Sequence, residues 1–189
     1  MNLILASASP RRKELLEFLG YAFEVKPANV DENVYSNEKA LDYVLRVCRD
    51  KCSLISVSSN DCVVLAADTS VVLGSDILGK PIDLADSNRM LVSLSGKRHR
   101  VLTAFSIYNP VSKEIKSEVV ESVVSFRVLS LNEIELYSDS REGFDKAGGY
   151  GFQNSALSFI SSIEGSPSNI IGLPLAEVKM ALDKVICLI

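Results

Sequence analysis

Hydrophobic residues recur along this chain with two different spacings, which separate expected helices from expected strands. In residues 38–55 they stand at Leu41, Val44, Leu45, Cys48, Cys52 and Ile55. That spacing places them on one face of an amphipathic helix. The short continuous apolar runs at 2–6 and 63–67 are instead typical of buried strands. Because the two patterns alternate without a regular strand–helix–strand repeat, the sequence favours an α/β fold with a mixed sheet flanked by helices.

Capping and turn residues set the expected boundaries of the other elements. Ser9 is a natural N-cap and Pro10 suits the first helical position, so a helix is expected over 10–19, ending at Gly20. Further helices are expected at 83–94 behind an Asp83 cap, from Ser130 in a capping box with Glu133, and at 175–187. Further strands are expected at 101–108, 118–129 and 157–163, with a hairpin around Asn109 and Pro110. Residues 71–73 either continue the strand at 63–67 or pair back after residues 74–76.

Composition indicates an ordinary globular protein. Of its 189 residues, 47% are hydrophobic and 23% are charged, and we expect one domain over residues 1–189. No apolar run reaches the length of a membrane span and no signal-peptide pattern stands at the amino terminus, so we expect a cytoplasmic protein without a membrane partner. The four cysteines, at 48, 52, 62 and 187, lack zinc-like spacing. We interpret Cys48 and Cys52 as small buried residues and not as metal ligands.

Net charge narrows the class of ligand. The formal charge of −4 argues against nucleic-acid binding, which requires a basic face. A small anionic ligand is still allowed where cations gather locally, and such a gathering follows the first expected strand: Ser7, Ser9, Arg11, Arg12 and Lys13. The positive end of a helix disfavours cations unless an anion is present, so this junction suits a phosphate chain. The alternative is a solvated basic turn.

Asp68 ends the apolar run at 63–67 and precedes Thr69. A carboxylate in that place is at most partly solvated, and a buried carboxylate is costly unless it is paired, hydrogen-bonded or bound to metal. Asp68 therefore requires a partner. The alternative, to which we give equal weight from this segment alone, is an aspartate that marks a turn at a strand end.

Other charged residues could meet an anion or a metal. Lys51 flanks the apolar stripe of the longest expected helix, so its stem can pack while its ammonium reaches a cleft. Asp31 and Glu32 precede that helix and could be metal or water ligands, or solvated loop charges. Lys80 lies in a Gly-Lys-Pro turn. Pro81 excludes a phosphate-binding P-loop there but leaves Lys80 available for a single phosphate contact.

A glycine-rich segment at 143–151 precedes Gln153. Glycines permit close backbone approach to a ligand, and the Gln153 amide could hydrogen-bond a base edge, although the segment could equally be a structural loop. His99 is the only histidine, so a catalytic triad or a histidine-rich metal site has no basis in this chain.

Six segments stand in a recognisable order along nearly the whole chain. They are Ser7-Ala8-Ser9-Pro10-Arg11-Arg12, Ala67-Asp68-Thr69, Leu78-Gly79-Lys80-Pro81, Ser95-Gly96-Lys97, Asp145-Lys146-Ala147-Gly148 and Gly172-Leu173-Pro174-Leu175. Together they resemble the Maf family of proteins. The resemblance implies an elongated mixed α/β fold like that of the inosine triphosphatases (Maf/Ham1), a central cleft, and hydrolysis of nucleoside triphosphates at the α-phosphate.

The resemblance also implies roles for individual residues. Asp68 falls at the proton acceptor proposed for the family. Arg11, Thr69 and Gln153 match the branch that acts on dTTP and UTP, whereas a sister branch acting on 7-methyl-GTP carries Trp and Gln at the first two of these positions. Departures from the family pattern are Gly143, Gly149 and Asn154, in place of Pro, Ala and Gly.

The mechanism that follows is an expectation about named residues. The substrate contacts are expected from Ser7, Ser9, Arg11, Arg12, Lys51, Thr69, Lys80 and Gln153. Glu32 and Asp68 would hold a magnesium or manganese ion, with Asp68 orienting or deprotonating the attacking water, and base and ligand roles stay open. The alternatives are a non-enzymatic nucleotide-binding regulator of septum formation and a pyrophosphatase for modified purine nucleotides. A homodimer is expected by analogy.

Overall fold

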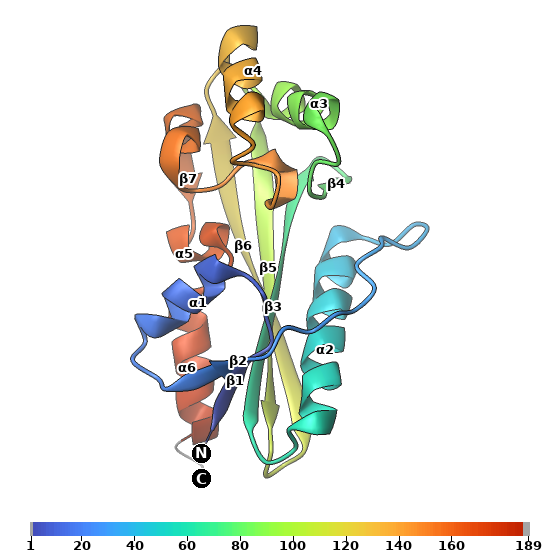
Figure 1. Cartoon of the computed structure of the whole chain (residues 1–189), viewed down its shortest axis with the longest axis vertical. Helices are drawn as coiled ribbons and strands as arrows, with labels where there is room; N and C mark the ends of the chain where they lie inside the picture. Colours follow the sequence, from blue (N-terminus) through green and yellow to red (C-terminus); the bar gives the residue numbers. More distant parts are fainter. Residues whose placement is uncertain (1, 187–189) are drawn as a thin grey trace. The chain divides into compact units, whose positions relative to one another are not determined.

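Residues 2–186 are described by the structure, a computed structural model (Figure 1). The helices are α1 (Pro10–Glu17), α2 (Ala40–Ser58), α3 (Leu84–Leu94), α4 (Leu131–Ser140), α5 (Pro167–Ile171) and α6 (Leu175–Ile186), with 3-10 turns η1 (Ala147–Gly149) and η2 (Asn154–Phe159). The strands are β1 (Leu3–Leu5), β2 (Phe23–Val25), β3 (Val63–Leu73), β4 (Asp76–Leu78), β5 (Arg98–Asn109), β6 (Glu114–Phe126) and β7 (Ile160–Glu164).

These strands form one mixed sheet in the order β2-β1-β3-β5-β6-β7, with β4 paired to β3. Strand β1 is parallel to both β2 and β3, with Leu5 opposite Val25 and Leu65. Strands β4 and β7 pair antiparallel with β3 and β6. The expected α/β fold with a mixed sheet and flanking helices is therefore confirmed.

The chain divides into two compact units, which are described separately. Unit 1 comprises Met1–Asp68, Thr103–Val120 and Gly172–Ile189, and unit 2 comprises Thr69–Leu102 and Glu121–Ile171. The single domain, the elongated outline and the central cleft stay predictions. No helix within residues 2–186 combines the length and the apolar character that crossing a membrane requires.

In unit 1, helix α2 packs along β3 (Figure 1). Val44, Cys48, Cys52 and Ile55 of the predicted apolar stripe are buried, whereas Leu45 is half-buried and Leu41, at the start of the helix, is exposed, so the stripe was predicted too wide. The thiols of Cys48 and Cys52 donate to the β3 carbonyl oxygens of Ala66 and Val64, at 3.5 and 3.6 Å. Burial raises the pKa of each thiol to about 12, so both stay protonated at neutral pH. The predicted burial of these two cysteines is confirmed.

Unit 2 closes around aromatic side chains. Phe126 packs edge to face on Tyr150 and Phe159, with ring centroids 4.8 and 6.0 Å apart, and Phe159 packs on Tyr137 at 5.2 Å. Helices α3 and α4 lie together against this cluster (Figure 1) and add buried Leu91 and other apolar residues. Edge-to-face ring pairs add stability beyond the area that they bury.

The predicted caps form, and they explain where the helices begin. The Ser9 hydroxyl accepts a hydrogen bond from the backbone N–H of Arg12 at 3.5 Å, and Pro10 takes the first helical position. The Asp83 carboxylate accepts from the N–H of Asp86 at 2.7 Å. The Ser130 and Glu133 capping box is present at the start of α4.

Several predicted boundaries were wrong. Helix α1 stops at Glu17, and α2 begins two residues later and ends three residues later than predicted. Of the two alternatives for residues 71–73, continuation of the strand at 63–67 is confirmed. The strand predicted at 157–163 begins only at Ile160, because a 3-10 turn precedes it. Residue 187, at the end of the last predicted helix, lies outside the described residues.

Candidate active site

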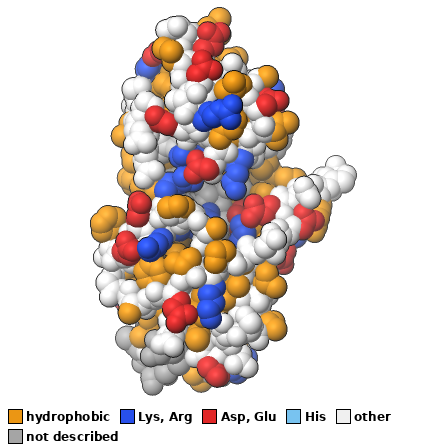
Figure 2. All heavy atoms as spheres, in the orientation of Figure 1, with side chains coloured by type: hydrophobic (Ala, Val, Ile, Leu, Met, Phe, Trp, Pro, Cys, Tyr) orange, Lys and Arg blue, Asp and Glu red, His pale blue; other side chains and the backbone are white. Residues whose placement is uncertain are grey.

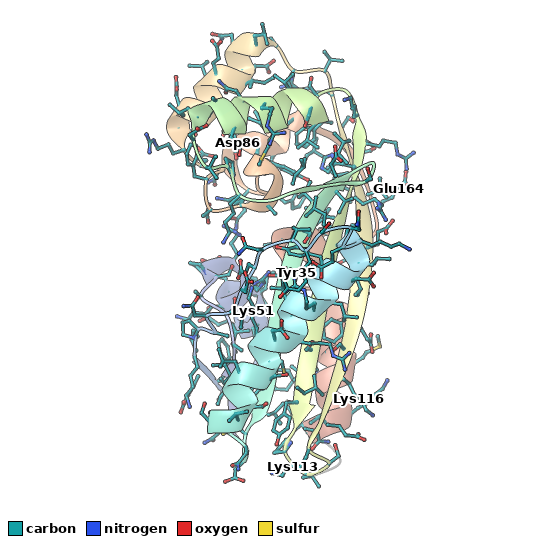
Figure 3. The ribbon with its side chains drawn as sticks, turned by 90° about the vertical axis from the view of Figure 1, so that its right-hand side faces the viewer. Tyr35, Lys51, Asp86, Lys113, Lys116 and Glu164 are labelled. Carbon is teal, nitrogen blue, oxygen red and sulfur yellow. The ribbon has the colours of Figure 1, made fainter. Side chains whose placement is uncertain are left out.

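A buried lysine and two acids meet inside unit 1. Lys51 lies on α2, and its Nζ atom is 2.7 Å from Asp68 Oδ1 on β3 and 2.6 Å from Glu32 Oε1 in the loop before α2 (Figure 3). Lys51 and Asp68 are only 7% and 8% exposed, whereas about half of the Glu32 side chain is accessible. A buried charge is costly unless it is paired, so each of the two buried groups stabilises the other.

Asp68 lies within β3, which continues beyond it to Leu73. The alternative interpretation of Asp68 as a turn residue at a strand end is therefore wrong. The neighbouring strand residues are buried, so the carboxylate has little access to water. Lys51 supplies the partner that a carboxylate in this position needs, as the sequence predicted without identifying it.

Arg12, in the first turn of α1, hydrogen-bonds to the loop before that helix and to a segment far along the chain. The Arg12 guanidinium donates to Ser7 Oγ at 3.3 Å and to the carbonyl oxygen of Gly172 at 2.9 Å. The backbone N–H of Ser9 also donates to Ser7 Oγ, at 3.2 Å. Ser7, Ser9 and Arg12 are thus brought together as predicted. Lys13 is not part of this group, because it pairs with Glu17 on the exposed side of the helix at 3.7 Å.

Arg11, the other cation of this segment, is half-buried next to Arg12 on α1. The pKa of the Arg12 guanidinium is lowered, mainly because the group is buried, and the positive charge of Arg11 lowers it further. The negative charges of Asp68 and Glu32 act in the opposite direction. The guanidinium stays charged in any protein environment. Arg12 therefore shares one electrostatic environment with the two acids that Lys51 bridges.

The loop that carries Glu32 has no regular structure and is held by two side chains of α2. Arg46 donates to the carbonyl oxygen of Asn33 at 2.8 Å and to the carboxylate of Glu38 at 2.6 and 2.9 Å. It also lies over the ring of Tyr35, 3.9 Å from the centroid (Figure 3). Tyr43 donates from its hydroxyl to the carbonyl oxygen of Glu32 itself, at 3.0 Å.

Sequence reasoning missed Arg46 and Tyr43 as supports of the site. Their i, i+3 spacing places both on one helix face, which was the available signal. The hydrogen bonds of Arg46 hold the pKa of Glu38 at about 2, so the pair is ionised at any ordinary pH. Asp31, the other predicted acid, accepts from the backbone N–H and side-chain amide of Asn33 and so forms part of the loop's own turn.

The remaining predicted site residues lie in unit 2. Thr69 follows Asp68 on β3 and is half-buried, Lys80 is exposed just after β4, and Gln153 is half-buried immediately before η2. Their predicted substrate contacts stay predictions.

The glycine-rich segment of unit 2 lies against the turn that carries Lys80. The N–H of Gly148 donates to the carbonyl oxygen of Gly79 at 2.9 Å. Gly148 and Gly149 have φ angles of 72° and 71°, which favour glycine. A Cβ atom on Gly143 would stand 1.9 Å from the carbonyl oxygen of Gly149, so no side chain fits at Gly143 on this backbone. The segment before Gln153 is therefore fixed by backbone contacts that only glycine allows.

Glu32 and Asp68 have the chemistry that a divalent cation requires. Hard cations such as Mg²⁺ prefer carboxylate oxygens and usually complete their coordination with water and substrate phosphates. One oxygen of each acid already converges on a single cation, the Lys51 ammonium. Among residues 2–186, no group of three or more His, Cys, Asp and Glu side chains is placed to hold a metal. The pair thus fits a cation that takes its other ligands from outside the protein.

Charges on the surface agree with a small ligand. On the face drawn in Figure 2, the Lys and Arg side chains are interspersed with Asp and Glu and form no continuous basic surface. A nucleic-acid-binding face would need such a surface.

Comparison with known proteins gives one family and a consistent group of relatives. The model of the family described as Maf-like protein matches residues 2–185. A protein of Anaeromyxobacter dehalogenans is 48% identical over 97% of this chain and 93% of its own length, one of Hahella chejuensis is 46% identical over 97% and 92%, and one of Vibrio parahaemolyticus is 43% identical over 97% of each. All three are named dTTP/UTP pyrophosphatase.

Two solved structures are similar at low sequence identity. A HAM1 protein from Coxiella burnetii is 13% identical with a TM-score of 0.49, over 97% of this chain and 99% of that one. The Ham1 protein of Staphylococcus aureus is 13% identical with a TM-score of 0.44, over 67% and 72%.

Proposed function

This chain belongs to the Maf-like protein family, and from that membership we propose that it hydrolyses dTTP and UTP to the monophosphate and pyrophosphate. The names of the three relatives support the substrates. The structural observation that supports the reaction most is the Asp68 carboxylate, buried inside β3 and paired with Lys51. A protein that only bound nucleotide would have little use for a costly carboxylate beside a site for triphosphate.

The cations of unit 1 bind the triphosphate in this proposal. Arg12, anchored by Ser7 and Gly172, presents a guanidinium in a fixed place, and guanidinium groups bind phosphate oxygens with two parallel hydrogen bonds. Lys51 adds a point charge from α2, and Arg11 adds a second guanidinium on α1. The Arg12 guanidinium, which is held in place before the substrate arrives, can stabilise the charge that develops during phosphoryl transfer.

Asp68 acts on the water. It orients the water that attacks the α-phosphorus and accepts its proton, while the bond from that phosphorus to the bridging oxygen breaks and pyrophosphate leaves. Mg²⁺ or Mn²⁺, held by Glu32 and Asp68, would neutralise charge on the phosphate oxygens when bound. Thr69, Lys80 and Gln153 of unit 2 stay predicted contacts to phosphate and base.

We also infer a cytoplasmic location and a homodimer, which stay hypotheses. The free thiols of Cys48, Cys52 and Cys62 support a reducing compartment, because thiols persist there without forming disulfides. Neither the location nor the dimer is needed for the chemistry proposed above.

Incubation of the protein with UTP, dTTP, CTP and GTP tests the proposal. The products are identified by ³¹P NMR, with Mg²⁺, with Mn²⁺ and with EDTA. UTP and dTTP should give a nucleoside monophosphate and pyrophosphate only when a divalent metal is present. A nucleoside diphosphate with orthophosphate would overturn the reaction type, preference for a modified purine triphosphate would overturn the substrate class, and tight binding without turnover would support the non-enzymatic regulator.

A further inference from the structure

Lys51 stands where the proposed metal would have to bind. Its ammonium group is within 2.7 Å of one oxygen from each proposed metal ligand, Glu32 and Asp68. A metal–oxygen bond to Mg²⁺ is about 2.1 Å long, so a metal bridging both oxygens would occupy nearly the same point as the Lys51 nitrogen. The ammonium and the metal cannot both be there.

The ammonium is also held firmly in that place. The Lys51 side chain is about nine-tenths buried, and it bonds to Asp68, which is buried to a similar extent. Hydrogen bonds between two ionised groups in a place with little water are among the stronger ones in proteins. The two carboxylates are therefore already occupied, and a metal that enters this site from water has to displace the Lys51 ammonium from them.

We propose that the Lys51 ammonium and the divalent metal are alternative occupants of the Glu32 and Asp68 carboxylates, and that the phosphate chain of the nucleotide exchanges them by drawing Lys51 away. This inference rests on the proposed function, because it assigns Lys51 a second partner, the triphosphate. In the protein without nucleotide, Lys51 neutralises both acids and keeps metal affinity low. When nucleotide binds, its phosphates offer Lys51 new acceptors and bring the metal that replaces it.

The exchange predicts that removing a positive charge strengthens metal binding. The affinity for Mn²⁺ alone, without nucleotide, is measured by electron paramagnetic resonance of the free ion. Lys51→Met should bind Mn²⁺ roughly 10- to 100-fold more tightly than the unchanged protein, because the charge-assisted hydrogen bonds that oppose metal entry are each worth about a factor of 10 or more. Combining Lys51→Met with Glu32→Gln should remove most of the gain.

Lys13→Met is the matched control. It removes the same side chain and charge from α1, where Lys13 is exposed and pairs with the equally exposed Glu17. It should change Mn²⁺ affinity by less than about twofold, since exposed charges are screened by solvent and salt. The gain of Lys51→Met should persist when ionic strength is raised, because it comes from a direct contact in a buried site.

Folding of each variant is checked by circular dichroism. If Lys51→Met does not fold, Lys51→Gln tests the same point, because an amide lacks the charge but keeps a donor toward the acids. Unchanged or weaker Mn²⁺ affinity in the folded Lys51 variant overturns the exchange, and so does an equal gain in Lys13→Met. The proposed function is tested separately by turnover of UTP in the unchanged protein, so the two ideas can fail independently.

Discussion

Units 1 and 2 bury polar side chains in opposite ways. In unit 1 a buried lysine and a buried aspartate, Lys51 and Asp68, form an ion pair, and Lys51 bonds to Glu32 as well. In unit 2 the buried pair is neutral: His99 Nε2 lies 2.6 Å from the Tyr150 hydroxyl, next to the ring of Phe126. His99 Nδ1 has no hydrogen-bond partner within residues 2–186. Burial lowers the pKa of His99 to about 4 and raises the pKa of Tyr150, so neither is ionised at neutral pH.

The two kinds of buried group suit different roles: the ion pair of unit 1 suits the proposed reaction, and the neutral pair of unit 2 suits packing of the core. Ionised side chains that neutralise each other can exchange partners when a charged ligand arrives, which suits a reaction on triphosphates. A neutral imidazole packed in an aromatic cluster offers a ligand no charge. Burying it costs free energy because one ring nitrogen lacks a hydrogen bond, and the packing of the surrounding rings offsets that cost. Substitutions in the two regions should therefore affect different measurements: turnover and ligand binding in unit 1, and folding stability in unit 2.

The largest expected effect is on the reaction. Asp68→Asn keeps the shape of the side chain but removes the proton acceptor, so we expect kcat/KM for UTP to fall by about 10² to 10⁴, the range for losing a general base. The protein should still fold, as judged by circular dichroism. Asp61→Asn, an exposed aspartate in the turn before β3, is the control and should keep full activity. Retention of most activity in Asp68→Asn would remove Asp68 from the mechanism.

The next effect is on stability in acid. Because His99 has a lower pKa when folded than when unfolded, only the unfolded chain takes up its proton as pH falls from about 6.5 toward 4. Stability should be constant above that window and fall by up to about 3 kcal/mol across it. Urea unfolding at several pH values measures this loss.

His99→Gln is the matched variant for that measurement, because an amide keeps a hydrogen-bonding group toward Tyr150 but does not titrate. The part of the acid loss that comes from His99 should be missing in the variant. An identical pH dependence in both proteins would show that other groups cause it and would weaken the contrast between the two units.

A smaller effect is expected from Arg46, which holds the Glu32 loop. Arg46→Met should raise the Mg²⁺ concentration for half-maximal activity by about tenfold, since a misplaced ligand loses roughly one charge-assisted contact. Arg89→Met is the control, because Arg89 likewise pairs with an acid, Asp86 of α3 (Figure 3), but is itself largely exposed and supports no part of the site. A pure stability loss with unchanged metal dependence would make Arg46 structural only.

The smallest expected effect concerns selectivity and extends the comparison to substrate recognition. Gln153→Ala, in unit 2, should reduce the ratio of kcat/KM for UTP over GTP by about fivefold, the worth of about one hydrogen bond. Arg12→Ala, in unit 1, should weaken UTP, CTP and GTP alike, because a cation reads charge and not base identity. If Gln153→Ala lowers all three equally while Arg12→Ala changes their ratios, the two roles are assigned backwards.

Local rules predicted the parts of the fold that depend on neighbouring residues. The caps at Ser9, Asp83 and Ser130 follow from short-range hydrogen bonding and were correct. The apolar stripe of α2 follows from helical spacing and was correct except at its start, where Leu41 is exposed. Strand β2 and helix α5 were missed, since each is short. Strand β2 is fixed by its parallel neighbour β1, whose pairing no local pattern shows.

The candidate site divides in the same way. The need of Asp68 for a partner could be predicted from burial alone. That the partner is Lys51, 17 positions earlier in the chain, depends on how α2 packs on β3. Arg46 supports the site by donating to a backbone carbonyl oxygen of an irregular loop. Every residue has such an oxygen, so the sequence of the loop cannot show which one Arg46 contacts.

The contact between Gly143 and the carbonyl of Gly149 restricts how this chain can change over evolutionary time. A mutation that gives residue 143 any side chain collides with that carbonyl, while an alanine at 149 would have to adopt a φ of 71°. Position 143 is therefore closed to other residues unless the loop first moves, whereas an alanine at 149 costs about 1–2 kcal/mol for its left-handed backbone. In a library that varies each position singly, folded sequences should be recovered far more often with a substitution at 149 than with one at 143.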